Sequence, residues 1–197
     1  MDRENYKWFY QSDFLNQDLH DRLLQYINEN PNFGITINVD GAVVKTESNL
    51  IENRFNDNSV CKTILSDPVL EFIELVENKL IQNGCKVPTI YNFGILFDPY
   101  PRPGVKAYKW HKDYNVIEHI QDPNKLWFTI FSLSDKEVNS EFTVSPTPEG
   151  PDFWNMGVRT AVATNKLFGH NMNLGHEYDP KDKNNVAILY IRWFDAS

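Results

Sequence analysis

The sequence predicts a mainly β protein of the sandwich or jelly-roll class, with helices at its N-terminal end. Two observations carry this prediction. After Gly84 the chain is a series of short apolar segments separated by Pro and Gly clusters, and before it two segments have helical periodicity. A chain of 197 residues is long enough for one domain with a real core. We expect a single domain over residues 1–197, with residues 1–88 as a helical and β support region and residues 89–197 as a jelly-roll core (double-stranded β-helix).

Two helices are expected in the support region. The first follows Asp13 and ends before Pro31, with apolar residues at helical spacing. The second has Asp67 as its N-cap, Pro68 at its first position and Gly84 near its C-terminal stop. Its apolar stripe comprises Val69, Phe72, Ile73, Val76 and Leu80. Both helices should pack on one sheet of the core.

The remaining segments have the alternation that is typical of strands. Between the helices, residues 33–44 alternate around an Asp40-Gly41 turn and predict a hairpin. The candidate strands after Gly84 are Thr89–Phe97, Ala107–Trp110, Leu126–Leu133, Glu141–Ser145, Thr160–Phe168 and Val186–Phe194.

Composition and charge exclude several classes of function. The net charge of −8 and the pI of about 5.1 disfavour sequence-independent binding to nucleic acid. No segment has the length of a membrane span, and the N-terminus lacks the apolar core of a signal peptide. We therefore expect a cytoplasmic protein without a membrane partner. Cys61 and Cys85 should be partly buried thiols rather than a disulfide.

The residues that indicate chemistry are His111 and Asp113, separated by one residue. On an extended strand, residues two apart point to the same side, so the imidazole and the carboxylate face one point. A second histidine from later in the chain would complete a set of two histidines and one carboxylate, which suits iron(II) and leaves coordination positions open. His176 and His170 are the two candidates for this ligand. The alternative is an ordinary strand end at the surface. We expect His20 on the surface of the first helix.

From about residue 89 to 194, the chain resembles the iron(II)- and 2-oxoglutarate-dependent dioxygenases, especially the prolyl-hydroxylase-like members. The matching segments are Trp110-His-Lys-Asp, Lys125–Asp135, Glu141-Phe-Thr-Val, Gly175-His176 and Arg192-Trp193-Phe194. The resemblance implies that His111, Asp113 and His176 are the catalytic metal ligands, because the last strand follows His176 at the family's usual distance. His170 remains the rival for the distal position; if His176 is the ligand, His170 would support the ligands, face the substrate or be a loop histidine.

The resemblance also implies a cofactor and a reaction. Fe(II) would be the metal and 2-oxoglutarate the co-substrate, with dioxygen as the oxidant. The substrate would be a small molecule or an amino-acid or peptide side chain, hydroxylated at a C–H bond. Asp113 is consistent with hydroxylation, because halogenases of the family have a small residue at this place. Two alternatives are a non-catalytic jelly-roll binding protein and a cupin-like metal enzyme that does not use 2-oxoglutarate.

One feature of the family pattern is missing. Members usually bind the far carboxylate of 2-oxoglutarate with an Arg or Lys about ten residues after the distal histidine, because a buried carboxylate needs a cationic partner. Here that position is Val186. Lys125 is the expected substitute, whereas Arg192 lies about 20 Å further along the strand from Val186. The other candidate groups are Arg159 and the hydroxyls of Tyr91 and Thr129.

Overall fold

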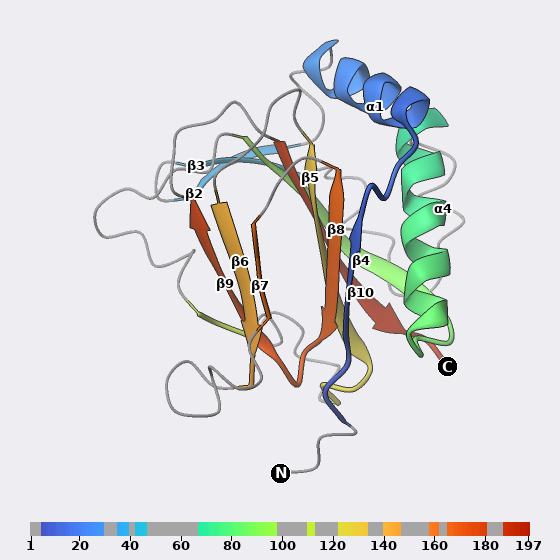
Figure 1. Cartoon of the computed structure of the whole chain (residues 1–197), viewed down its shortest axis with the longest axis vertical. Helices are drawn as coiled ribbons and strands as arrows, with labels where there is room; N and C mark the ends of the chain where they lie inside the picture. The colour runs from blue at the N-terminus through green and yellow to red at the C-terminus, as the bar shows by residue number, and fades with distance from the viewer. Residues whose placement is uncertain are drawn as a thin grey trace.

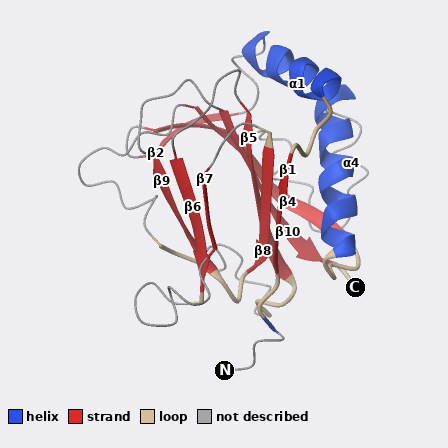
Figure 2. Ribbon diagram, in the orientation of Figure 1, coloured by secondary structure: helices blue, strands red, loops and turns tan. Residues whose placement is uncertain are grey.

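The computed structural model describes residues 5–29, 35–39, 42–46, 67–97, 110–112, 122–133, 140–146, 158–161, 165–180 and 187–197. Two helices and ten strands lie within these ranges (Figure 2). Their bounds are β1 (Trp8–Ser12), α1 (Gln17–Glu29), β2 (Ile35–Val39), β3 (Ala42–Thr46), α4 (Asp67–Gln82), β4 (Pro88–Phe97), β5 (Leu126–Leu133), β6 (Ser140–Ser145), β7 (Val158–Ala161), β8 (Lys166–Asn171), β9 (Gly175–Pro180) and β10 (Ala187–Asp195).

The strands form two facing antiparallel sheets. The large sheet has the order β1-β8-β5-β10-β4-β3-β2, and the small sheet has the order β7-β6-β9. From β4 onward the chain moves repeatedly between the sheets: β4, β5, β8 and β10 belong to the large sheet, and β6, β7 and β9 belong to the small one. An isolated bridge between His111 and His176 adds one more segment to the small sheet, beside β9. This is the double-sheet arrangement of a jelly roll, as the sequence predicts.

The two helices cover the outer face of the large sheet (Figure 1). Their apolar faces form one buried cluster with the outward-facing residues of β5, β8 and β10. The largest fully buried side chains of that cluster include Trp127, Trp193, Phe72 and Phe131. The expectation that both helices pack on one sheet is confirmed. Truncating a buried leucine of this layer, such as Leu23, to alanine typically costs about 2–5 kcal/mol.

Alternation along the strands decides which residues face the small sheet. In β5, Trp127 and Phe131 belong to the helix-side cluster, whereas the ring of Phe128 contacts Phe142 of the small sheet. In β10, Trp193 belongs to the helix-side cluster, and so the even-numbered residues face the small sheet. The same holds in β8. The even-numbered positions of these three strands therefore line the space between the sheets, where a site would lie.

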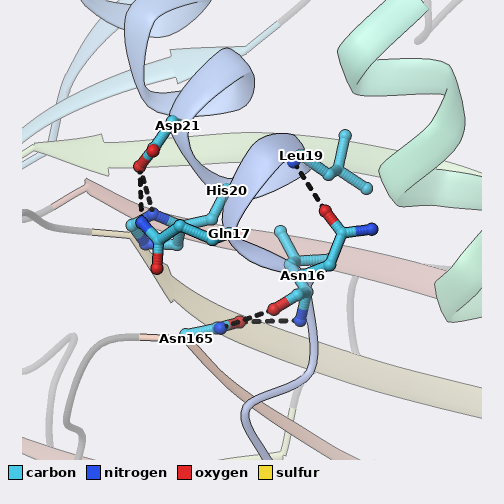
Figure 3. A network of polar contacts seen from close by, with 7 residues as sticks. Asn16, Gln17, Leu19, His20, Asp21 and Asn165 are labelled. Atoms are coloured by element: carbon cyan, nitrogen blue, oxygen red, sulfur yellow. Dashed lines mark hydrogen bonds and ion pairs between the residues drawn. The ribbon is translucent and has the colours of Figure 1, made fainter.

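Helix α1 begins later than the sequence suggests. Its N-cap is Asn16, whose Oδ1 accepts a hydrogen bond of 2.9 Å from the backbone N–H of Leu19 (Figure 3). Asp13, which the sequence places before this helix, has a φ of 48°. The helix begins only at Gln17, because its cap is Asn16, three residues nearer the apolar stripe. The α4 signals are confirmed: the helix begins at Asp67, and Gly84 follows its end with a φ of 99°.

Asn165 divides a segment that the sequence predicts as one strand. The segment Thr160–Phe168 belongs instead to β7 in the small sheet and β8 in the large sheet. Asn165 has a φ of 59°, and its side chain accepts from the Leu15 N–H and donates to the Leu15 carbonyl, both at 2.7 Å (Figure 3). These bonds join the start of β8 to the segment before α1 and stabilise it. No local sequence pattern reveals that β8 starts here.

Strand β1 and His20 differ from the sequence predictions, and Cys85 adds detail to them. Strand β1 is not expected from the sequence, and it pairs with β8. His20 is buried, with 7% of its surface exposed, rather than lying on the surface. Cys85 is buried and in no disulfide, and burial raises the pKa of its thiol to about 12; Cys61 lies outside the described residues. Among the described residues, no helix is long and apolar enough to cross a membrane.

Candidate iron site

His111 and His176 are brought together by direct backbone pairing. The N–H of His111 donates to the His176 carbonyl at 3.0 Å, and the N–H of His176 donates to the His111 carbonyl at 2.9 Å. Their rings meet edge to face with centroids 4.4 Å apart. His176 is buried, with 5% exposed, and His111 is half-buried. Two residues far apart in the sequence therefore present their imidazoles at one place, the inner edge of the small sheet.

Gly175 allows this close approach. A Cβ atom added there would lie 2.5 Å from the ring of Trp110 and 2.7 Å from the carbonyl oxygen of His111. Trp110 Nε1 in turn donates to the Oγ of Ser145 at 3.0 Å, and Ser145 pairs with Gly175 between β6 and β9. The Trp110 ring thus lies across the glycine, and only a residue without a side chain fits beneath it.

The Gly175→Ala variant should lose iron affinity as well as stability. Overpacking of this kind costs about 1–3 kcal/mol, and here it pushes the His111 segment away from β9. Gly169→Ala is the matched control, because its Cβ would lie 2.2 Å from the Phe9 ring on the helix side. We expect chemical denaturation to show lower stability for both variants, but anaerobic iron(II) titration to show weaker binding only for Gly175→Ala. Equal iron affinity in the two folded variants would contradict this role of Gly175.

Aromatic rings from both sheets pack against His176. The ring of Phe128 stacks on it with centroids 4.3 Å apart and an interplanar angle of 16°, and the Phe142 ring lies 5.4 Å away. Such a wall excludes water from one side of the imidazole and fixes the plane of the ring.

His170, the rival for the distal position, contacts His176 directly. Its Nε2 lies 3.1 Å from the Nδ1 of His176, and its Nδ1 lies 2.9 Å from the backbone oxygen of Asn171. The side chain is fully buried, with 0% exposed. His170 therefore has hydrogen-bonding partners at both ring nitrogens, whereas the pairing with His111 belongs to His176.

The two paired imidazoles fit one shared metal ion. An imidazole nitrogen binds a metal at about 2.1 Å, so two rings on one ion have centroids within about 6 Å of each other; the centroids of His111 and His176 are closer than this. Asp113, the third expected ligand, lies outside the described residues. Within the described part of the chain, no three His, Cys, Asp or Glu side chains gather into a metal site.

Lys112 supports the segment that leads to Asp113. Its Nζ donates to the Asn173 carbonyl at 2.8 Å, which ties the segment to the turn between β8 and β9. Burial lowers the pKa of Lys112. The two histidine-bearing segments are therefore joined through this lysine as well as through the bridge.

Arg192 faces the space between the sheets. It is directly opposite Phe128 in the β10–β5 register, and directly opposite residues share a face. Its Cζ lies 5.3 Å from the ring centroid of Tyr190, which itself stacks near Phe128 with centroids 6.3 Å apart. Phe128, the register partner of Arg192, stacks its ring on that of His176.

Lys125 and Thr129 lie elsewhere. Lys125 is exposed, and its Nζ donates to the backbone carbonyl of Ser197 at 2.6 Å. Thr129 faces the helix side, where its Oγ1 accepts from the Nε1 of Trp193 at 2.8 Å. Neither position supports a role in binding the co-substrate. The sequence could not reveal the orientation of Thr129, because a shift of one residue in the strand register moves every side chain of β5 to the opposite face.

For the other residues expected to bind the co-substrate, the structure describes at most the position of the backbone. Tyr91 lies in β4 at an irregularity in the pairing with β10, and Arg159 lies in β7 opposite Thr143. The structure does not describe the side chains of Tyr91 and Arg159. Val186 lies outside the described residues.

Comparisons with known proteins agree on the fold. No protein-family model matches the sequence, and no curated protein matches it. Among solved structures, a Pseudomonas putida prolyl-4-hydroxylase is 13% identical with a TM-score of 0.61, covering 100% of this chain and 96% of that one. The non-heme α-ketoglutarate-dependent epimerase SnoN from nogalamycin biosynthesis is 8% identical with a TM-score of 0.62, covering 99% and 81%. AviO1 from Streptomyces viridochromogenes Tue57 is 12% identical with a TM-score of 0.54, covering 98% and 91%. The chain therefore has the jelly-roll fold of the 2-oxoglutarate- and iron-dependent oxygenases.

Proposed function

We propose that the protein is an iron(II)- and 2-oxoglutarate-dependent oxygenase that binds its metal through His111, Asp113 and His176. The observation that carries this proposal is the antiparallel bridge between His111 and His176, with ring centroids 4.4 Å apart. Asp113 follows His111 by two residues, and on an extended backbone both side chains would point to the same side. Two imidazoles and one carboxylate are the ligand set of non-heme iron(II) oxygenases.

We further propose that Arg192 binds the far carboxylate of 2-oxoglutarate. Its guanidinium lies over the ring of Tyr190, and its register partner Phe128 stacks on His176. A guanidinium offers two parallel N–H donors to a carboxylate, and the surrounding rings raise the strength of that pair by excluding water. Arg192 thus takes the role that the residue at position 186 has in the family.

The bound iron and 2-oxoglutarate supply the power to oxidise a substrate C–H bond with dioxygen. The residues of this chain supply position and exclusion of water. His111 and His176 would hold the metal at the edge of the small sheet, and Phe128 and Phe142 pack against the ring of His176 and keep water from that side of the imidazole. Hydroxylation of a small molecule or of an amino-acid or peptide side chain is the reaction that we propose.

An anaerobic titration tests this function. We expect iron(II) and 2-oxoglutarate together to give the weak visible absorption band of the chelate, with one iron per chain, and iron(II) with succinate to give none. Iron binding without the band would contradict the 2-oxoglutarate role and favour a cupin-like metal enzyme. No iron binding at all would contradict the whole proposal and favour a non-catalytic jelly-roll protein.

A further inference from the structure

We infer that His170 is a positioning residue, which holds the proton of His176 on Nδ1 and so leaves the Nε2 lone pair of His176 for the metal. This inference rests on the proposed function. It follows from a chain of hydrogen bonds that runs from the Asn171 backbone through His170 to His176.

The first link fixes the proton on His170. Its Nδ1 lies 2.9 Å from the backbone oxygen of Asn171. A carbonyl oxygen can only accept a hydrogen bond, so the Nδ1 of His170 carries the proton and donates it.

The second link fixes the proton on His176. His170 is fully buried, and its ring centroid lies 5.6 Å from that of Phe128. A neutral imidazole with its proton on Nδ1 has its acceptor lone pair on Nε2. The Nε2 of His170 therefore accepts, and the Nδ1 of His176 at 3.1 Å is the donor. The remaining lone pair of His176 is on Nε2.

The N-terminal segment of the protein fixes Asn171, whose carbonyl oxygen is the first link in this series of hydrogen bonds. The backbone N–H of Asn171 donates to the Lys7 carbonyl at 2.9 Å, and its Nδ2 donates to the Asn5 carbonyl at 2.7 Å. The backbone N–H of Lys7 donates in return to the Oδ1 of Asn171 at 3.3 Å. Asn171 also pairs with Trp127 in the large sheet. Asn171 is thus fixed on two sides, by the N-terminal segment and by the large sheet.

This arrangement has a direct consequence for metal binding. A histidine that binds a metal donates its other N–H to a fixed partner, which sets the tautomer and the orientation of the ring. An imidazole without such a partner favours the tautomer with the proton on Nε2, which cannot bind through that nitrogen. Loss of a partner of this kind typically lowers metal affinity about 10–100-fold.

Two variants at position 170 test the inference. His170→Phe keeps a ring of similar size among Phe128 and Phe142 but removes the acceptor. His170→Gln keeps an acceptor oxygen near the place of Nε2. We expect anaerobic iron(II) affinity to fall about 10–100-fold in His170→Phe and to be largely retained in His170→Gln. His20→Phe, which replaces a buried histidine in α1, is the control and should bind iron(II) like the wild type.

A second readout does not depend on the metal. Long-range ¹H–¹⁵N NMR correlation of metal-free protein labelled at histidine reports which ring nitrogen carries the proton, and the His176→Ala variant assigns the signals. We expect Nδ1–H for His176 in the wild type and Nε2–H in His170→Phe. If His170→Phe does not fold, the tautomer of His176 in the wild type decides the question by itself.

The outcomes separate this inference from the proposed function. Nε2–H on His176 in the wild type, or wild-type iron affinity in folded His170→Phe, would overturn the positioning role while leaving the iron site intact. An Nδ1–H tautomer in a wild-type protein that binds no iron(II) would overturn the proposed function, and with it the role of His170 toward a metal.

Discussion

The His176→Ala variant is expected to bind iron(II) at least about 100-fold more weakly than the wild type. Loss of a residue that only supports a metal ligand costs about 10–100-fold, so loss of a ligand itself should cost more. A hundredfold change corresponds to about 2.7 kcal/mol of binding free energy. Anaerobic equilibrium dialysis with iron(II) measures the change, and the absorption band with 2-oxoglutarate should disappear at iron concentrations that saturate the wild type.

His20→Ala is the control for this variant. His20 is also buried, but it lies in α1 on the far side of the large sheet (Figure 1). We expect it to lose some stability while keeping its affinity for iron(II). Wild-type affinity in His176→Ala would remove His176 from the ligand set and make His170, its direct neighbour, the candidate.

The Arg192→Met variant is expected to bind 2-oxoglutarate about 10–150-fold more weakly, with little change in iron affinity. Removing a hydrogen-bonding partner of a charged group costs about 1.5–3 kcal/mol. Methionine keeps part of the apolar stem of arginine but has no cation. Arg192→Lys should recover only part of the affinity, because an ammonium cannot form the two parallel bonds. Titration of the absorption band with 2-oxoglutarate on iron-loaded protein measures these dissociation constants.

Lys125→Met distinguishes the two candidate cations. Lys125 is exposed and bonded to the C-terminal Ser197, so its removal should leave 2-oxoglutarate binding unchanged. A large loss of 2-oxoglutarate affinity in Lys125→Met, together with none in Arg192→Met, would reverse the assignment of the carboxylate partner.

Local signals in the sequence are sufficient for some elements. The α4 bounds follow from Asp67, Pro68 and Gly84, because capping and helix termination are decided within one turn. The bounds of β5, Leu126–Leu133, agree with the sequence prediction because six of its eight residues are apolar and all eight are buried.

Elements that depend on distant partners could not be predicted. Strand β1 is an edge strand whose partner, β8, comes from the other end of the chain. The division at Asn165 depends on hydrogen bonds to Leu15, which precedes α1. In each case the deciding contact is long-range, and the local sequence pattern does not contain it.

The candidate site also combines features that the local sequence predicts with features that depend on distant contacts. The spacing of His111 and Asp113, together with the family resemblance, predicts a metal site that His176 completes, and this stays a prediction because Asp113 lies outside the described residues. A supporting role for His170 is one of the roles that the sequence leaves open, but its hydrogen bond to His176 comes from the tight turn between β8 and β9, which places the two rings together. The placement of Arg192 on the face between the sheets depends on the β10–β5 register, which the sequence alone does not fix.

The most direct measurement of the central claim is a crystal structure of the protein grown anaerobically with iron(II), with anomalous data collected at the iron edge. We expect one anomalous peak at about 2.1 Å from a nitrogen of His111 and from the Nε2 of His176, with a carboxylate oxygen of Asp113 as the third protein ligand. A peak bonded to His170 in place of His176, or no peak between the two paired histidines, would contradict the account.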